Sequence, residues 1–234
     1  AKLFEKANID YLIAVEPQEK DEYVKALGKK RVLVLPFSNL GLGSYPARNF
    51  CWEHAKERGH KYHWLFDDNF LMFKKWVNSK RVRIENISDA IKYVELNADK
   101  TNVDITGFER PEFCCKVPKK PFKYNCHVYS AMLIKNDLPY RWRLKYNEDV
   151  DLCLQVLHNG GTTSSCVYYM AKKTDTGQKM KGGNQTELYK GNAKEKKILK
   201  AKMLEAVWPQ YTKTVIRFNR PHHFVDWKKF KPKK

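Results

Sequence analysis

The sequence predicts a single α/β domain, spanning residues 1–234, in which a mostly parallel central sheet is flanked by helices. Its length of 234 residues fits one such domain better than two small ones. Hydrophobic residues make up 42% and aromatic residues 13% of the chain, which is enough to fill a core. Short apolar stretches also alternate with helical ones near the N-terminus, and that order is typical of parallel sheets.

The first predicted elements are a strand, a helix and a second strand. Residues 9–15 form a buried strand that stops at Glu16 and Pro17, because proline ends a strand. A short helix is predicted over residues 18–27, before Gly28, and the next strand over residues 31–36. This order predicts a parallel, right-handed unit.

A loop with two glycines follows over residues 38–44, and a helix is predicted over residues 45–59. Gly41 and Gly43 allow the backbone to approach a ligand closely. Arg48 offers a planar guanidinium that suits a phosphate group. The loop does not match the Walker or dinucleotide-binding glycine patterns, so nothing specific supports a nucleoside triphosphate or a nicotinamide cofactor.

The stretch that organises the chain is residues 62–66, a short apolar run that ends in Asp67, Asp68 and Asn69. We interpret it as a buried strand, and its carboxylates must lie at the strand end because a bare charge is too costly in the core. Ligands bind at such ends in open α/β sheets. Asp67 and Asn69 point to the same side of an extended chain, and with Asp68 they suit a hard divalent cation. A capped turn is the alternative interpretation.

A second acidic cluster begins a predicted helix over residues 147–161. Glu148, Asp149 and Asp151 lie at its start, apolar residues are spaced through it, and glycine ends it. Simple N-capping is one interpretation, but three carboxylates exceed what a cap needs. A carboxylate at a helix start near another acidic cluster is well placed to act as a general base.

The other segments are assigned by apolar pattern and capping residues. His127 lies between apolar neighbours, and we expect a packed or hydrogen-bonded role for it rather than a ligand role. The predicted elements are the start of a helix at residues 70–76, a helix at 88–95 capped by Ser88, strands at 124–134, 166–170 and 215–218, a loop at 172–184, and a lysine-rich helix at 186–204.

The charge of the chain indicates its partner. Lys and Arg number 45 against 26 Asp and Glu, which gives a net charge of +19 and attracts polyanions. Nucleic acid is the leading candidate, an anionic membrane surface the second, and a merely solubilising basic surface the alternative. No apolar run is long enough to span a membrane, and the N-terminus does not have the pattern of a signal peptide.

Several segments are candidates for contact with nucleic acid. Residues 140–146 alternate aromatic and cationic side chains, a pattern that suits either base stacking or an amphipathic strand. A basic tail follows over residues 220–234. The candidate DNA-binding residues are Arg141, Trp142, Arg143, Lys172, Lys173 and Lys179.

The six cysteines show no paired Cys-x-x-Cys spacing, so we expect reduced, mostly buried thiols and no zinc site.

In their order along the chain, these motifs resemble those of a glycosyltransferase of the GT-A fold. The resemblance implies that the strand-end motif holds a divalent metal, Mn²⁺ or Mg²⁺, on the diphosphate of a nucleotide sugar. A later Glu-Asp pair then supplies the base, and a histidine near the C-terminus completes the metal site. Asn69 departs from this pattern, in which an aspartate is expected. Either metal binding is weaker, or ligation moves to Asp67, Asp68 and a histidine.

A closer resemblance is to the TET-associated glycosyltransferases of bacteriophages, over residues 9–230. The motifs that carry it are Ala47-Arg48-Asn49-Phe50, Trp64 with Asp67-Asp68-Asn69, Asn147-Glu148-Asp149-Val150-Asp151-Leu152, Lys181-Gly182-Gly183-Asn184 and Arg220-Pro221-His222-His223. This resemblance implies transfer of a sugar from a nucleotide sugar, expected to be UDP-linked, to 5-hydroxymethylcytosine or another 5-hydroxymethylpyrimidine in double-stranded phage DNA. The modification would hide the genome from host nucleases, in the cytoplasm of the infected cell.

The same resemblance implies roles for individual residues. Asp149 is the expected base, with Glu148 as second choice. The expected donor-binding residues are Glu16, Pro17, Arg48, Asn49, Asp67 and Lys181. The expected metal ligands are Asp67, Asp68, Asn69, His222 and His223.

Three other hypotheses remain open at this point. One is a GT-A enzyme with a glycan or protein acceptor, which would not need the lysine-rich helix and tail. Another is a non-catalytic DNA-binding protein on a decayed transferase scaffold. A nuclease that holds metals with carboxylates is the third. The sequence leaves open whether the target base is flipped out of the duplex.

Overall fold

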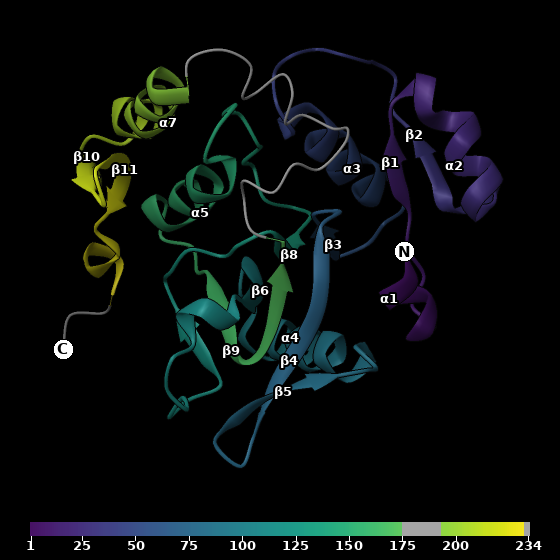
Figure 1. Ribbon diagram of the computed structural model, residues 1–234, viewed down its shortest axis with the longest axis horizontal. Helices are drawn as coiled ribbons and strands as arrows, with labels where there is room; N and C mark the ends of the chain where they lie inside the picture. The colour runs from purple at the N-terminus through teal and green to yellow at the C-terminus, as the bar shows by residue number, and fades with distance from the viewer. Residues whose placement is uncertain (175–192, 232–234) are drawn as a thin grey trace.

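A sheet of seven strands runs through the middle of the protein. The computed structural model describes the backbone of residues 1–174 and 193–231, and the side chains of 1–174 and 198–231. In this described part the strand order is β3-β8-β6-β9-β4-β5, with β7 paired to β9 (Figure 1). The strands are β3 Tyr62–Phe66, β4 Phe70–Val77, β5 Lys80–Ile84, β6 Ile105–Glu109, β7 Phe122–Tyr124, β8 Ala131–Lys135 and β9 Ser164–Lys173.

This main sheet is mixed and mostly antiparallel. Strands β6 and β9 pair in parallel, whereas the pairs β3–β8, β8–β6, β9–β4, β4–β5 and β7–β9 are antiparallel. The α/β class is therefore confirmed, but the prediction of a mostly parallel central sheet is wrong. The reason is that β4 and β5 form a hairpin and β8 enters in the opposite direction between β3 and β6, which the helix-strand alternation near the N-terminus does not reveal.

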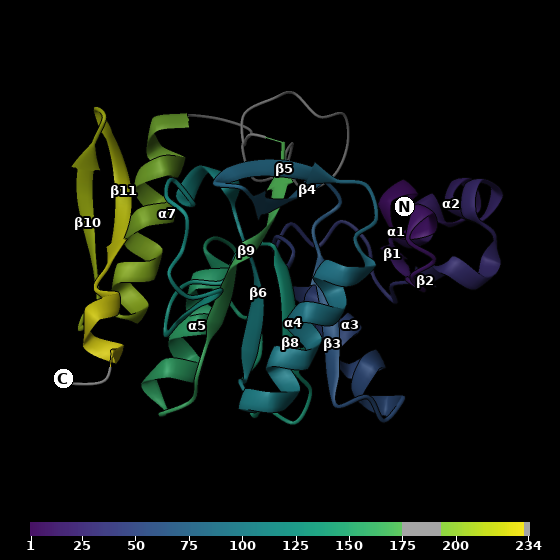
Figure 2. The same cartoon turned by 90° about the horizontal axis from the view of Figure 1, so that it is seen from below.

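The N-terminal strands form a small sheet of their own. β1 (Ile13–Val15) and β2 (Val32–Val34) pair in parallel, as their order predicts, and α2 (Lys20–Leu27) connects them between the short 3₁₀ turns Pro17–Glu19 and Lys29–Arg31. No hydrogen-bonded ladder joins this pair to the main sheet in the described residues. Figures 1 and 2 both place it at one end of the molecule.

Helices cover both faces of the main sheet. On one face α4 (Ser88–Thr101) and α1 (Lys2–Lys6) pack over aromatic side chains such as Phe73 and Phe108. On the other face α3 (Tyr45–Glu57) and α5 (Glu148–His158) pack around Met132. Alternate residues of a strand face opposite sides, so successive residues of β8 enter different cores.

The C-terminal elements attach to α5 at the other end of the molecule. α7 (Ala193–Val207) is followed by the hairpin of β10 (Thr212–Arg217) and β11 (Arg220–Val225) and by the 3₁₀ turn Trp227–Phe230. Leu204 and Trp208 pack on Leu154 of α5. Figure 2 shows the hairpin on the outer side of α7, beyond α5.

Two local predictions are wrong, and one of the two interpretations of residues 140–146, an amphipathic strand, is not observed. Residues 70–76 form strand β4 instead of a helix, because Asn78 and Ser79 both adopt a positive φ and turn the chain into the β4–β5 hairpin. The predicted strand at 124–134 breaks into β7 and β8 with an irregular crossing between them. Residues 140–146 form no regular strand.

Candidate functional site

The carboxylate of Asp67 lies at the end of β3 between two cations. Its Oδ1 is 2.8 Å from Nη2 of Arg48, and its Oδ2 accepts a hydrogen bond of 2.8 Å from Nζ of Lys173, at the end of β9. Nζ of Lys173 also donates to Oγ of Ser130, at 2.6 Å. Burial opposes ionisation of Asp67, but the two cations outweigh it and lower the pKa of this carboxyl. Both oxygens of Asp67 are therefore engaged.

Arg48, in the first turn of α3, is shared by the two acidic clusters. Its Nη2 is 3.4 Å from Oε1 of Glu148, and its Nε donates to Oγ of Ser44, which in turn donates to Glu148. The guanidinium lies 4.6 Å from the ring centroid of Trp142, and its side chain is only 11% exposed. Nη1 is buried with no hydrogen-bond partner in the described part of the chain. One donor of a buried cation is thus free for an anion.

Arg48, Asp67 and Lys173 together form what we call the ion-pair centre. The first turn of α5 presents Glu148 and Asp149 to this centre. Burial raises the pKa of Glu148, and the charge of Asp149 raises it further, while Arg48 opposes this. Burial would also raise the pKa of Asp149, but His127 and Arg48 outweigh burial and lower it well below its usual range. Neighbouring carboxyls whose pKa values are pushed apart are typical of acid–base sites.

His127 lies against Asp149, with its Nε2 3.0 Å from Oδ2. The irregular crossing between β7 and β8 carries both His127 and Ser130 to the sheet end. The imidazole packs against the ring of Tyr129, with 3.9 Å between the ring centroids, and lies parallel to the indole ring of Trp227. His127 is thus packed between two rings, one of the two roles expected for it, and its ion-pair partner is the predicted base.

The two late histidines lie on β11 itself and are consecutive, so they project to opposite faces. Burial lowers the pKa of His223 to about 4, and the charges that act on it are those of Asp149, His127, Lys200 and His222. His223 is thus within electrostatic range of Asp149. A single metal ion cannot take both side chains from opposite faces of a strand.

The described residues do not fit the expected divalent-metal site. Asp67 is paired with two cations, Asp68 is exposed, and Asn69 contributes one neutral oxygen, Oδ1, which is buried without a partner. In the described part of the chain, no three His, Cys, Asp or Glu side chains come together as metal ligands. The centre is instead built from ion pairs.

A comparison with protein-family models identifies the relatives of this chain. The model of the TET-Associated Glycosyltransferase family matches residues 1–183. The chain belongs to this family. A search of curated protein sequences found no match.

The TET-associated glycosyltransferase match covers the whole ion-pair centre and stops before the C-terminal elements. Arg48, Asp67, Asp149 and Lys173 all fall within residues 1–183, whereas α7 and the β10–β11 hairpin lie beyond them. The strand that carries His223 therefore lies outside the match.

Besides Arg48 and Asp67, two more of the predicted donor-binding residues have structural partners. Asn49 donates from Nδ2 to the carbonyl of Trp142 and accepts at Oδ1 from its backbone N–H, so its amide holds residues 140–146 against α3. Glu16 accepts from the backbone N–H of Asn39, which ties the end of β1 to the glycine loop, and Pro17 begins the adjacent 3₁₀ turn. The donor roles of Glu16, Pro17 and Asn49 stay predictions.

Most of the predicted DNA-binding residues are also engaged within the protein. Trp142 is 1% exposed, so its indole is part of the core. Arg141 pairs with Glu53, and Arg143 with Asp151. Lys172 is partly exposed beside Lys173. Lys179 and Lys181 lie outside the described residues, as do most of the predicted 172–184 loop and the first part of the predicted lysine-rich helix.

A large cleft opens between the N-terminal sheet and β3. Its volume is about 1530 Å³, and it reaches Asp67 and Asp68 at one end. Ala14 of β1 and Leu33 of β2 line one wall, and Trp64 of β3 lines the other. The surface of the cleft is more apolar than polar, and charged groups lie at the end formed by Asp67 and Asp68.

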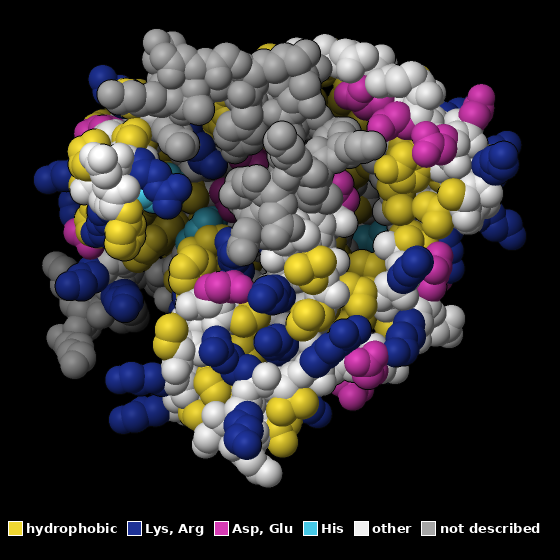
Figure 3. Space-filling model, in the orientation of Figure 1, with side chains coloured by type: hydrophobic (Ala, Val, Ile, Leu, Met, Phe, Trp, Pro, Cys, Tyr) yellow, Lys and Arg dark blue, Asp and Glu magenta, His cyan; other side chains and the backbone are white. Residues whose placement is uncertain are grey.

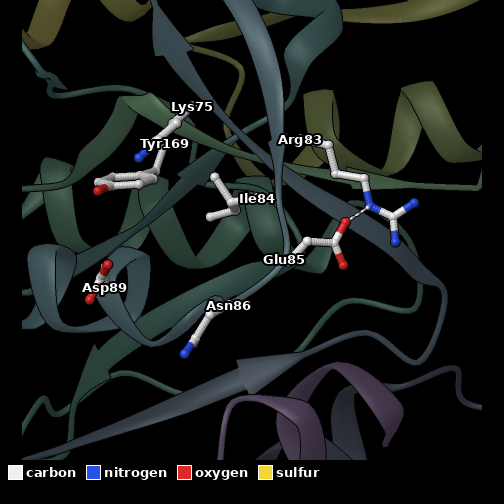
Figure 4. Close-up of a pocket in the computed structure, with 7 residues that line it drawn as sticks. All are labelled: Lys75, Arg83, Ile84, Glu85, Asn86, Asp89 and Tyr169. Atoms are coloured by element: carbon white, nitrogen blue, oxygen red, sulfur yellow. Dashed lines mark ion pairs between the residues drawn. The ribbon is translucent and has the colours of Figure 1, made fainter.

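A second hollow lies on the opposite part of the sheet, beside the β4–β5 hairpin (Figure 4). Its volume is about 290 Å³, and Arg83 pairs with Glu85 there at 3.1 Å. Lys75, Asp89 and Tyr169 lie around it. The described residues that line it include none of those predicted for the functional site.

The sequence pattern missed the partners that complete the centre. Lys173 was assigned to DNA, Ser130 received no role, and His127 was not connected to Asp149. The only local signal was the polar residues within the apolar stretch 124–134, which mark a break in the strand.

None of the described helices combines the length and the apolar character needed to cross a membrane.

Proposed function

We propose that this protein transfers a sugar from a nucleotide sugar to the hydroxymethyl group of a 5-hydroxymethylpyrimidine in double-stranded DNA. The observation that carries the proposal is the joint placement of two cations, Arg48 and Lys173, and of the Glu148–Asp149 pair at one sheet end, in a member of a glycosyltransferase family. The two cations suit a leaving diphosphate, and the Glu148–Asp149 pair suits an attacking hydroxyl.

The donor lies in the cleft of about 1530 Å³, with its diphosphate toward Asp67. Arg48 offers the unpaired Nη1 donor, and Lys173 turns from Asp67 toward the phosphate oxygens. Cations in a buried site stabilise charge that develops on a leaving group more strongly than they would in water. The apolar walls near β1 accommodate the nucleoside and exclude water.

The acceptor hydroxymethyl group approaches Asp149. Its hydroxyl proton passes to the Asp149 carboxylate, its oxygen bonds to the anomeric carbon, and the bond from that carbon to the diphosphate oxygen breaks. The electron pair stays on the diphosphate, beside Arg48 and Lys173. His127 is a positioning residue: at 3.0 Å from Oδ2, it holds the carboxylate ionised and oriented.

The charge of the protein favours DNA as the acceptor. The net charge is +19, and Figure 3 shows lysine and arginine side chains gathered over the region of β4 and β5. Lys80, Arg81 and Arg83 are exposed there. Such an excess attracts a polyanion from a distance and holds its phosphates without reading its sequence.

The decisive experiment is a transfer assay with defined DNA. Duplexes that contain 5-hydroxymethylcytosine, 5-hydroxymethyluracil or neither are incubated with UDP-, GDP- and dTDP-sugars, with Mn²⁺ or with EDTA, then digested and analysed by mass spectrometry. We expect a hexose or N-acetylhexosamine increment on one hydroxymethylated base. DNA binding without an increment from any donor would instead favour a non-catalytic binding protein.

Variants connect this activity to the site. Asp149→Asn should abolish transfer while nucleoside diphosphate binding, measured by calorimetry, stays close to wild type.

Lys173→Met should weaken nucleoside diphosphate binding and lower transfer by roughly 10- to 100-fold, because one cation near the diphosphate is lost. Lys92→Met, an exposed lysine on α4, is the matched control and should change neither.

A further inference from the structure

The β10–β11 hairpin ends in an exposed aromatic residue between two arginines. Strand pairing places Arg217 opposite Arg220, and Phe218 and Asn219 form the two-residue turn between them. Phe218 is 86% exposed, and its three neighbours in this hairpin tip (residues 217–220) are exposed too. The tip is thus a projecting ring with a cation on either side.

The aromatic turn residue and the facing arginines both destabilise the folded protein when it is considered without a partner. Phe218 has a φ of 49°, in the left-handed region that bulky residues avoid. Two arginines directly opposite each other repel across a strand pair. The β4–β5 hairpin shows the ordinary solution, because its two turn residues are Asn78 and Ser79. A residue kept in such a place against local preference indicates a role outside the fold.

The chemistry of the tip matches a nucleic-acid duplex. Arginines pair with phosphates on both sides, and apolar rings can enter between stacked bases. The Arg217 guanidinium is already positioned, 5.7 Å over the ring centroid of Phe224. We propose that the hairpin tip inserts Phe218 into the base stack of the DNA and helps to extrude the target hydroxymethylpyrimidine. This inference rests on DNA as the acceptor in the proposed function.

The hairpin connects its tip to the catalytic centre. Val225 of β11 packs in one buried cluster with Val150, the residue after Asp149. His223, on the same strand, is within electrostatic range of Asp149, and Phe218 lies five positions before His223 in the chain. At about 3.3 Å per residue, the tip is roughly 15 Å from His223. The Asp149 and Glu148 side chains are only 23% and 18% exposed. A base inside the stack cannot reach such recessed carboxylates, whereas an extruded base can.

The test compares Phe218→Gly with wild type and with Leu96→Ala, which removes an apolar side chain that is 69% exposed on α4. Glycine removes the ring and relieves the positive φ, so the melting temperature should stay equal or rise. The probe is a duplex with 2-aminopurine beside 5-hydroxymethylcytosine, whose fluorescence rises when the stack opens. Wild type and Leu96→Ala should raise it, and Phe218→Gly should not.

Transfer kinetics provide a second readout. Phe218→Gly should lower kcat/KM on paired DNA by about tenfold, the usual size of a lost stacking contact. When the target base is mismatched it leaves the stack more easily, so the defect should shrink to about twofold or less. Arg217→Gln with Arg220→Gln should weaken DNA binding and make the salt slope of log K less negative by about 2.

The outcomes separate this inference from the proposed function. If wild type transfers sugar and Phe218→Gly matches it in fluorescence and kinetics, the tip inference is wrong and the function stands. If no donor is used but 2-aminopurine still responds to wild type and to Leu96→Ala and not to Phe218→Gly, the inference stands and the function is wrong. Absence of DNA binding, or preferential binding of the tip to anionic phosphatidylserine vesicles, would overturn the inference.

Discussion

Arg48 is the residue on which the geometry of the centre depends most. It contacts Asp67 from β3 and Glu148 from α5, so it connects the two acidic clusters across the sheet end. A buried cation between two carboxylates favours their charged forms where an unpaired charge would be too costly. The spare Nη1 donor then makes this structural cation available to an anionic ligand.

At the same scale, His127 sets the proton affinity of Asp149. Because His127 lowers the Asp149 pKa, we expect His127→Gln to raise it and to move the acidic limb of the kcat/KM–pH profile to higher pH. The wild-type profile should lack this limb between pH 5 and 7. We also expect kcat to fall by roughly 10- to 100-fold.

His158→Gln is the control for this prediction, because His158 lies at the far end of α5 and bonds to Tyr211. Its profile should match wild type. An unchanged acidic limb in His127→Gln would show that His127 does not act through Asp149.

His63 makes the folded state sensitive to acid. Its Nδ1 lies 2.6 Å from Oδ1 of Asn136, while Nε2 is buried without a partner, so the ring is neutral. Burial lowers its pKa to about 4 from a usual 6.5. Between these values the unfolded chain binds more protons, so stability is present above pH 6.5 and is lost as pH falls toward 4.

We expect His63 to contribute about 2 kcal/mol to the drop in unfolding free energy from pH 7 to pH 5. His63→Phe should remove that share of the drop, although it lowers stability at pH 7 by leaving Asn136 unpaired. Urea titrations at the two pH values measure both effects. His60→Gln, at an exposed position, should keep the wild-type drop, and an equally steep drop in His63→Phe would contradict the assignment.

At the scale of elements, α5 joins the sheet end that carries the ion pairs to the C-terminal elements. Asp151 is fully buried on this helix, and it accepts hydrogen bonds from the Arg143 guanidinium, from the Gln155 amide and from the indole of Trp208. Trp208 follows α7, which packs against β11. One buried carboxylate thus holds α5 to the segment at Arg143 and to Trp208 at the end of α7.

Asp151→Asn should lower the unfolding free energy by about 2 kcal/mol, because the amide offers one acceptor oxygen in place of two at this fully buried position, and the indole of Trp208 or the Gln155 amide loses its acceptor. Denaturant unfolding followed by tryptophan fluorescence measures this loss. Asp137→Asn is the control, since that side chain is 73% exposed, and its effect should stay within about 0.5 kcal/mol. An equal effect of the two substitutions would mean that the network contributes little.

At the scale of the whole molecule, the positive charge is spread over the surface while the negative charge of the site is neutralised internally. Exposed lysines and arginines surround the β4–β5 hairpin, whereas Asp67, Glu148 and Asp149 are paired with Arg48, Lys173 and His127. A polyanion therefore does not meet a bare acidic centre as it approaches.

This distribution predicts strongly salt-dependent DNA binding. If about six phosphates are contacted, the affinity for a duplex should fall by about 10³-fold between 50 and 200 mM salt. Fluorescence anisotropy with a labelled duplex measures this slope, and binding of a nucleoside diphosphate in the cleft is the comparison, with a much weaker dependence. A flat slope for DNA would favour a glycan or protein acceptor.

The sequence by itself determined the strand that ends in Asp67, the helix that begins with Glu148 and Asp149, the family and the positive charge. The strand and the helix are local features, because an apolar run interrupted by carboxylates is costly anywhere except at a strand end or a helix start. The family and the charge follow from the residues themselves. Each can therefore be found without knowing where the rest of the chain lies.

Only the tertiary structure decided which side chains meet. The β4–β5 hairpin and the entry of β8 make the sheet mostly antiparallel, and the break between β7 and β8 delivers His127 and Ser130. Arg48, Asp67 and Lys173 are far apart in sequence, and their pairing depends on how strands and helices pack. Long-range contacts of this kind leave no periodic signal in the sequence, so the internally paired charges of the centre became visible only in the fold.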